Sequence, residues 1–229
     1  MRSQNHIGTL YIIATPIGNL EDITLRAVEV MKSTDLIVAE DTRTARNLLG
    51  RFGIGKPIIS YFARSPEAKI REIIDYIKNG KNIAYVSEAG TPGISDPGQK
   101  LVSAAVKEDI VVVPIPGASA LTAALSVSGF DTSRFIFFGF PPAKKGREKF
   151  FKEAASIGSV VILYESPHRI IKTLGQLEAF IVQRQVMVAR ELTKKFETIY
   201  RGTISEILKR LKPEEIRGEF VIVLDKTSK

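Results

Sequence analysis

The sequence contains no cysteine and only two histidines among its 229 residues. Without cysteine it can form neither a disulfide framework nor a thiolate metal site. One histidine lies near the N-terminus and the other is His168, so ligands for a metal are scarce and none is expected. A Ser-His-Asp hydrolase would depend on His168 alone, and no serine stands in a nucleophile elbow.

Long hydrophobic runs are also missing. No apolar stretch approaches the roughly 18 residues that a membrane span requires, and the first residues do not form a signal-peptide pattern. We therefore expect no membrane partner and a cytoplasmic location. Met1–His6 is expected to form a loose tail.

What the chain has in excess is positive charge. Its 33 lysines and arginines outnumber 25 acidic residues, which leaves a formal net charge of +8. Such a balance favours a polyanionic partner, nucleic acid first. With 44% hydrophobic residues the chain can bury a sizeable core, and its length suits one large domain or two small ones.

The first half alternates strand and helix patterns. Strands are predicted at Gly8–Ala14, Leu36–Ala39, Pro57–Tyr61, Ile83–Val86 and Ile110–Ile115. Helices are predicted between them, for example near Thr24–Lys32, with Leu25 and Val28 buried. A further helix should start at Ser65 as N-cap with Pro66 in its first position, and bury isoleucines spaced i, i+3, i+4, i+7. This rhythm predicts an α/β fold with a doubly wound parallel sheet.

The pattern changes after Gly117. Strands are predicted at Phe135–Phe138, Val160–Tyr164, Val186–Arg190, Glu197–Arg201 and Phe220–Leu224. Ser166-Pro167 repeats the helix-start pattern, and Thr203 with Glu206 fits a capping box. We expect two α/β domains, residues 1–116 with the parallel sheet and residues 117–229 with a mixed sheet that includes antiparallel strands.

One loop stands out, Ser87–Gly98, which follows a predicted buried strand and leads into a helix. It holds three glycines and two prolines, which allow a ligand to approach the main chain and give the loop a defined shape. Ligands of α/β sheets bind at the carboxyl ends of strands, where this loop lies. A Walker A phosphate site is not indicated, because Lys100 is misplaced for that motif.

Acidic residues follow several predicted strands, namely Glu40, Asp41, Glu88, Glu165 and Glu191. Because a doubly wound sheet brings strand ends together along one edge, these carboxylates are expected to converge there. The simpler alternative is that each strand ends where solvent begins.

Basic residues cluster twice in the second half. The first cluster contains Lys144, Lys145, Arg147, Lys149 and Lys152, and the second contains Arg190, Lys194, Lys195 and Arg201. Such groups neutralise phosphates, and Phe140 can stack on an unpaired base. The alternatives are a solvated helix face for the first cluster and a core role for the phenylalanine strand.

The motifs together carry a resemblance that runs from Gly8 to Leu224. They are Thr15–Leu20, Glu40–Arg43, Ala89–Gly98, Pro116–Ala120, Phe138–Phe140, Tyr164–Arg169, Glu191–Lys194 and Gly218–Phe220. In these the chain resembles the bacterial 16S ribosomal RNA ribose 2′-O-methyltransferases of the tetrapyrrole methylase superfamily. The resemblance implies S-adenosylmethionine as methyl donor in a cleft between two α/β domains, a cytidine of 16S ribosomal RNA or the small ribosomal subunit as substrate, and a homodimer.

The resemblance also implies roles for particular residues. The donor would be bound by Pro16, Glu88, Gly90, Thr91, Pro92, Gly93, Ile94, Ser95, Ser119, Ala120, Tyr164, Ala189, Gly218 and Glu219. RNA would be bound by Arg43, Lys144, Lys145, Arg147, Arg169 and Lys194. By position, the acceptor of the 2′-hydroxyl proton would be Asp41, Glu191 or Lys195.

Two departures from the family pattern concern this machinery. The family usually has aspartate where Glu88 stands, and often Tyr-His-Glu-His where this chain has Tyr61–Arg64.

The sequence leaves two alternatives to an RNA methyltransferase: a small-molecule tetrapyrrole methylase, and a non-catalytic RNA-binding or assembly factor that keeps a donor pocket.

Overall fold

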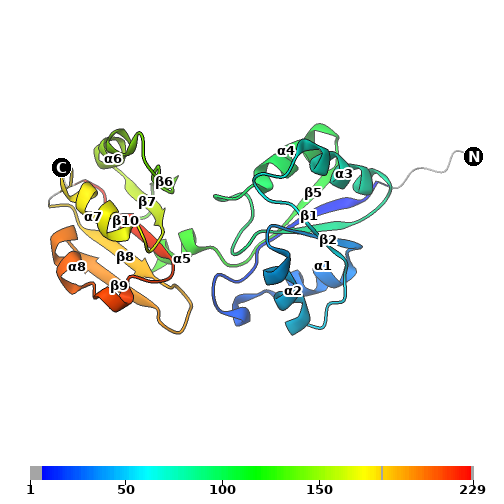
Figure 1. Ribbon diagram of the computed structural model, residues 1–229, viewed down its shortest axis with the longest axis horizontal. Helices are drawn as coiled ribbons and strands as arrows, with labels where there is room; N and C mark the ends of the chain where they lie inside the picture. The colour runs from blue at the N-terminus through cyan, green and yellow to red at the C-terminus, as the bar shows by residue number, and fades with distance from the viewer. Residues whose placement is uncertain (1–6, 182, 228–229) are drawn as a thin grey trace, which may run out of the picture. The chain divides into compact units, whose positions relative to one another are not determined.

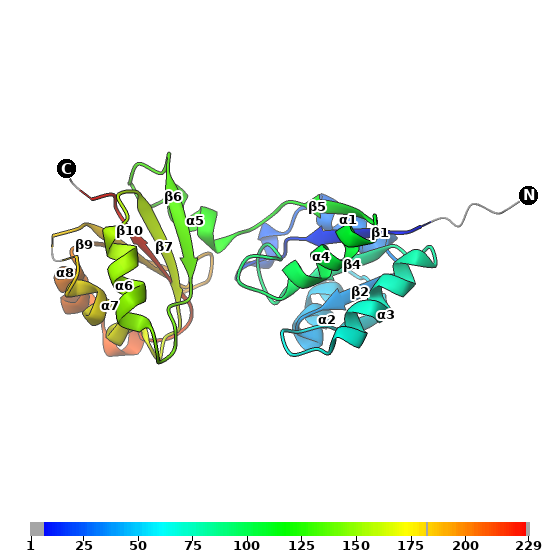
Figure 2. The same cartoon turned by 90° about the horizontal axis from the view of Figure 1, so that it is seen from above.

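The computed structural model describes residues 7–181 and 183–227 (Figure 1, Figure 2). The tail predicted at residues 1–6 lies outside this part. The chain divides into two compact units, one ending at Ser119 and the other beginning at Ala120. No helix in the described ranges is both long and apolar enough to cross a membrane.

The first unit is built on a five-stranded sheet in which all strands are parallel. The strands are β1 (Thr9–Ile13), β2 (Leu36–Ala39), β3 (Ile58–Ser60), β4 (Ile83–Val86) and β5 (Val111–Ile115). Their order is β3-β2-β4-β1-β5. The predicted doubly wound parallel sheet is therefore confirmed. In such sheets ligands bind on the loops that follow the carboxyl ends of the strands, at the point where the strand order reverses.

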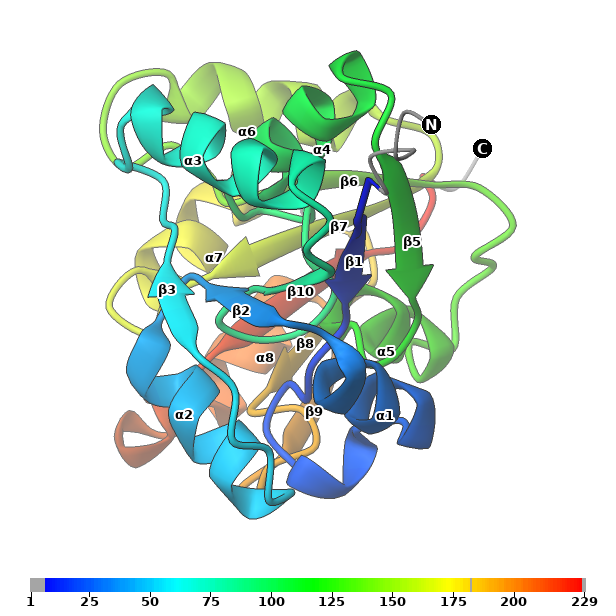
Figure 3. The ribbon, with the colours of Figure 1, turned by 90° about the vertical axis from the view of Figure 1, so that its right-hand side faces the viewer.

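Helices cover both faces of this sheet. They are α1 (Leu25–Ser33), α2 (Thr42–Arg51), α3 (Glu67–Lys78) and α4 (Gly98–Lys107), with the short 3-10 helix η1 at Leu20–Asp22. One core joins α1 and α2 to the sheet and a separate core joins α3 and α4 to the other face (Figure 3). Since β4 is covered on both sides, all four of its residues are buried.

Two local predictions in this unit are wrong. Ser65 does not cap α3, because its hydroxyl accepts the Phe62 N–H at 2.9 Å, and Pro66 takes the N-cap position without a side-chain bond. Leu25 is 86% exposed, because α1 meets the sheet only from Ala27 onwards. The isoleucine stripe of α3 is confirmed, with Ile73, Ile74 and Ile77 buried.

The second unit holds a mixed five-stranded sheet. Its strands are β6 (Phe135–Gly139), β7 (Val160–Glu165), β8 (Val186–Arg190), β9 (Thr198–Gly202) and β10 (Phe220–Leu224), in the order β6-β7-β10-β8-β9. β6 runs parallel to β7, and the other three neighbouring pairs are antiparallel. The predicted mixed sheet is therefore confirmed.

The helices of this unit are α5 (Ala120–Ser126), α6 (Arg147–Ser156), α7 (Ile170–Glu178) and α8 (Ile204–Arg210), with the 3-10 helix η2 at Pro213–Glu215. α6, α7 and α8 share one core against the sheet, while α5 packs against β10. The Thr203–Glu206 capping box is present. Ser166-Pro167 does not start α7, which begins at Ile170 after a turn that carries the exposed His168.

Candidate functional site

The loop Ser87–Gly98 joins β4 to α4 at the carboxyl edge of the first sheet. Three of its residues have positive φ, with values of 76° at Gly90, 88° at Gly93 and 66° at Ser95. Glycine adopts this region without strain, whereas for Ser95 it is uncommon. The loop therefore takes a shape that an ordinary strand-to-helix connection does not need.

Asp96 holds this shape. Its carboxylate accepts the backbone N–H of Gly93 and the backbone N–H of Gly98, both at 2.7 Å. Bonds to an ionised acceptor are among the stronger ones in proteins. An aspartate two residues before a helix-opening glycine is a known turn and cap signal.

The loop is also fastened to its neighbours. Thr15 and Gly90 exchange two backbone hydrogen bonds of 3.0 Å, which join it to the loop that carries Pro16. The Thr91 hydroxyl donates to the Ala118 carbonyl at 3.1 Å. Of the residues predicted to bind the methyl donor, Pro16, Glu88 and Gly90–Ser95 therefore lie on two loops that are hydrogen-bonded to each other.

The glycines of this loop differ in what surrounds them. A Cβ on Gly98 would lie 2.5 Å from the Tyr85 ring, and one on Gly90 would lie 3.2 Å from the Ile17 side chain. Apart from Gly93 itself and its two chain neighbours, no heavy atom of the described chain lies within 4 Å of a Cβ on Gly93. Packing of the protein explains the first two glycines, whereas Gly93 leaves its main chain open to a ligand.

Carboxylates and tyrosines gather beside this loop. The Glu40 carboxylate accepts the Glu88 N–H, and burial together with the charge of Asp96 raises the pKa of Glu40. Burial and the same charge raise the pKa of Tyr85, whose ring meets Tyr61 edge-on at 6.0 Å. These phenols stay protonated at neutral pH and serve as packing rather than as bases.

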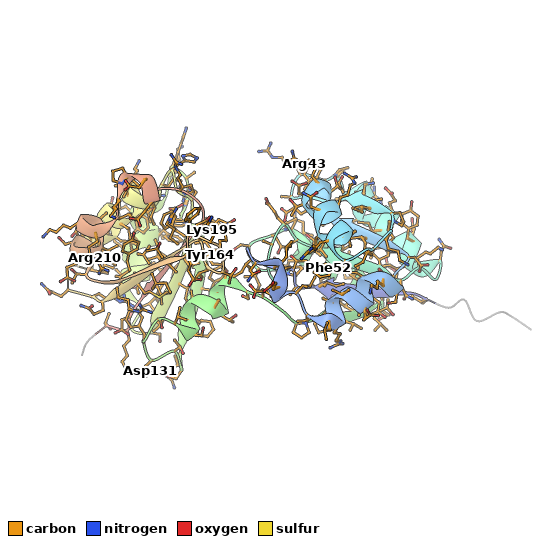
Figure 4. All side chains as sticks on the ribbon, turned by 90° about the horizontal axis from the view of Figure 1, so that it is seen from below. Arg43, Phe52, Asp131, Tyr164, Lys195 and Arg210 are labelled. Carbon is orange, nitrogen blue, oxygen red and sulfur yellow. The ribbon has the colours of Figure 1, made fainter. Side chains whose placement is uncertain are left out.

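Asp41 acts as the N-cap of α2. Its carboxylate accepts the backbone N–H groups of Arg43 at 2.7 Å and Thr44 at 3.3 Å, and pairs with the Arg43 guanidinium at 3.2 Å. The hydrogen bonds from Arg43 and Thr44 lower the pKa of Asp41. The Arg43 side chain is 85% exposed and projects from the start of α2 (Figure 4).

In the second unit, Glu191 lies in a tight group that follows β8. Lys194 donates to Glu191 at 2.8 Å and to Glu219 at 3.0 Å, and the Glu219 N–H donates to Glu191 at 3.1 Å. Burial would raise the pKa of Glu191, but the bonds from Lys194 and Glu219 outweigh it, so this pKa is lowered. Gly218 is needed here, because a Cβ on it would lie 2.1 Å from the Glu191 carboxyl carbon.

The same segment carries backbone strain. Glu191 and Thr193 have φ values of 52° and 65°, which are rare for non-glycine residues and especially for a β-branched one. Lys195 is exposed, and its ammonium lies 5.6 Å from the Phe196 ring centroid. Of the two side chains, Lys194 is bound by carboxylates and Lys195 faces solvent.

Tyr164 and Ala189 differ in accessibility. The Tyr164 hydroxyl accepts the Leu121 N–H, and burial raises the pKa of this phenol to about 12. Its ring contacts Phe137 and Phe140 edge-on. Ala189 is fully buried in β8.

The first basic cluster divides into exposed and buried members. Lys144 and Lys145 are exposed, whereas Arg147 is 6% exposed and donates to Gln176, Pro142 and Thr173. Arg147 is therefore not presented to phosphate at the surface, because its guanidinium is buried and each of its three nitrogens donates to a group of the protein.

The predicted convergence of the acidic residues at one edge is wrong. Glu40, Asp41 and Glu88 follow strands of the first sheet, while Glu165 and Glu191 follow β7 and β8 of the second. The chain forms two sheets, and each has its own set of carboxyl strand ends.

Two solved structures share this fold. The structure matches that of diphthine synthase with a TM-score of 0.76 over 97% of this chain and 92% of that chain. It matches cobalt precorrin-4 methyltransferase with a TM-score of 0.70 over 95% and 94%. Both are 16% identical in sequence, so they establish the fold.

The sequence comparisons establish the family. The family of tetrapyrrole (corrin/porphyrin) methylases matches residues 9–208. The chain belongs to this family, and it is accordingly a methyltransferase that uses S-adenosylmethionine.

Several curated relatives share one name, Ribosomal RNA small subunit methyltransferase I. The protein from Thermotoga maritima is 44% identical over 95% of this chain and 98% of its own length. The protein from Hydrogenobaculum sp. is 48% identical over 95% of each chain. The protein from Halalkalibacterium halodurans is 45% identical over 95% of this chain and 76% of its own length.

Proposed function

We propose that this protein methylates small-subunit ribosomal RNA, at the ribose 2′-hydroxyl of a cytidine. The observation that carries the proposal is the 44% identity to the Thermotoga maritima rRNA methyltransferase over nearly the whole of both chains. The finer assignment to a cytidine and to the 2′-hydroxyl rests on the motif resemblance described above. The net charge of +8 fits an RNA substrate.

The loop Ser87–Gly98 fits the methyl donor. The main chain is open at Gly93, and the left-handed conformations of Gly90, Gly93 and Ser95 shape the loop around it. We assign the methionine and sulfonium end to Gly90–Ser95 and Pro16, with Glu88 at the mouth of the loop. Ser119, Ala120, Tyr164, Ala189, Gly218 and Glu219 remain proposed contacts for the rest of the donor. When bound, S-adenosylmethionine supplies a methyl group that is already activated on a sulfonium.

The contribution of the protein is therefore mainly alignment, which lowers the barrier without a strong base. The Asp96 carboxylate keeps the loop in one conformation before binding, so less ordering is needed when the donor arrives. The lowered pKa values of Asp41 and Glu191 make both carboxylates weak proton acceptors. Lys195, the third candidate, would accept the proton only in its neutral form.

For the RNA we retain the exposed basic residues. Arg43, Lys144 and Lys145 face solvent and can neutralise phosphates. Lys194 pairs with two carboxylates, so its charge is already matched within the protein. From the resemblance we also propose a homodimer, which light scattering after size-exclusion chromatography tests, and a cytoplasmic location.

Methyl transfer from labelled S-adenosylmethionine tests the proposed function. The acceptors are 30S particles that lack the modification, naked 16S RNA and a porphyrinoid. Label in RNA that digests to 2′-O-methylcytidine is the expected result. Label in the porphyrinoid alone would indicate a tetrapyrrole methylase, and binding to particles without transfer would indicate an assembly factor.

A further inference from the structure

A buried polar network lies beneath the exposed lysines of the second unit. Arg147 opens α6, Glu165 ends β7, and Arg169 and Thr173 lie just before and within α7. The Thr173 hydroxyl donates to Glu165 at 2.6 Å and accepts from Arg147 at 2.7 Å. The Arg169 guanidinium pairs with both Glu165 oxygens, at 2.9 and 3.1 Å.

Both guanidinium groups extend to the same loop. Arg147 donates to the Pro142 carbonyl at 2.8 Å, and Arg169 donates to the neighbouring Pro141 carbonyl. Proline has no N–H, so the carbonyls are the only backbone groups through which Pro141 and Pro142 can be hydrogen-bonded. The network therefore fixes the segment that begins with Phe140 and carries Lys144 and Lys145.

Stability alone does not account for such an arrangement. Burying charged groups carries a desolvation cost, and well-packed apolar side chains often serve a core equally well or better. Here the single carboxylate of Glu165 faces two guanidinium groups, Arg169 bonded to it directly and Arg147 linked to it through Thr173, so positive charge is in excess next to the exposed lysines. An excess of this sign beside a fixed loop suits a phosphate backbone.

We infer that Phe140, Lys144 and Lys145 form an RNA-contacting tip, and that Arg147 and Arg169 are positioning residues which hold this tip through Glu165 and Thr173. The inference rests on the proposed function. It differs from the sequence-based assignment, in which Arg147 and Arg169 themselves touch RNA. Phe140 is 52% exposed although its ring meets Tyr164 edge-on, so about half of this side chain remains accessible to a base.

A double-mutant cycle in the full-length protein tests this inference. The tip variant is Lys144→Ala/Lys145→Ala, and the positioning variant is Arg169→Gln. A control with the same loss of charge is Lys172→Ala/Lys209→Ala, two exposed lysines on α7 and α8 of the same unit. We measure affinity for 30S particles at several salt concentrations, the affinity for S-adenosylmethionine, and KM and kcat for methyl transfer.

The tip variant should weaken particle binding by on the order of tenfold and reduce its salt dependence, while donor affinity and kcat stay near wild type. Arg169→Gln alone should weaken particle binding, but add little in the tip-variant background, because it acts through the tip. Arg169→Lys should resemble Arg169→Gln, because an ammonium lacks the planar fork that spans Glu165 and the Pro141 carbonyl.

Additive effects, or full rescue by Arg169→Lys, would overturn the positioning role and indicate direct contact of Arg169 with phosphate. Tip variants that bind particles as the control does would overturn the RNA-contacting tip. Both outcomes are distinct from failure of the proposed function, in which the wild-type protein itself transfers no methyl group to RNA.

Discussion

Replacing Gly93 by alanine separates the role of this glycine in the fold from its role at a ligand. Gly93 has a φ of 88°, and no heavy atom of the described chain lies within 4 Å of the Cβ that alanine would add. Inside the protein the substitution therefore creates no clash. It costs only the backbone strain of a left-handed alanine, about 1–2 kcal/mol.

Gly53 provides a matched control within the same unit. It has a φ of 64° in the turn after α2, and likewise nothing within 4 Å of an added Cβ. Gly53→Ala and Gly93→Ala should therefore lower thermal stability by similar amounts. Gly93→Ala should in addition displace a ligand from the main chain, which costs about 1.5 kcal/mol for one lost hydrogen bond or close contact.

The assay is calorimetric titration with S-adenosylmethionine, with the melting temperature of each variant measured alongside. An extra 1.4 kcal/mol corresponds to about tenfold in Kd, so Gly93→Ala should bind about tenfold more weakly than Gly53→Ala. Equal affinities in the two variants, at equal loss of melting temperature, would refute the assignment of the loop Ser87–Gly98 as the donor cradle.

Three further predictions concern single carboxylates and one arginine. Asp96→Ala leaves the Gly93 and Gly98 N–H groups without their acceptor, so it should weaken binding of S-adenosylmethionine about tenfold in titration calorimetry. Asp96→Asn should weaken it less, because one acceptor oxygen remains. Affinities equal to that of the wild-type protein would contradict the preorganised loop. Arg184→Met should lower the free energy of unfolding by about 2–4 kcal/mol in denaturant titration, since this buried guanidinium binds five backbone carbonyls; a neutral result would contradict its anchoring role. The pKa of Glu40 is raised in the folded state, which means that the folded protein disfavours the ionised carboxylate. The protein therefore loses stability as the pH rises through that pKa and Glu40 ionises. Glu40→Gln should therefore melt higher than wild type at pH 7, and the difference should vanish below the ordinary pKa of 4.5; a difference that persists in acid would contradict this cause.

The regular elements of both units followed closely from the sequence. β2 and β4 have the predicted bounds, because short runs of apolar residues between turn signals are typical of strands buried on both faces. The capping box at Thr203 was found for a similar reason, since its two partners are only three residues apart. Local chemistry is enough to predict such features.

Polar and charged side chains were predicted less well. Arg147 was placed on an RNA surface, yet it is buried by partners 26 and 29 residues further along the chain. Ser65 was predicted to cap α3, yet its hydroxyl accepts the N–H of Phe62 three residues earlier. A long polar side chain can reach several partners, and its actual partner depends on how the elements pack.

By itself, the sequence determined that the chain alternates strands and helices, that its sheets are one parallel and one mixed, and that Ser87–Gly98 is a loop rich in glycine and proline. Apolar periodicity and the conformational limits of glycine and proline are local properties, so they can be read along the chain. Only the tertiary structure decided that Asp96 holds the loop Ser87–Gly98 and that Arg147 and Arg169 bond the carbonyls of Pro142 and Pro141. Those roles depend on hydrogen-bond partners that folding brings within 3 Å of each other.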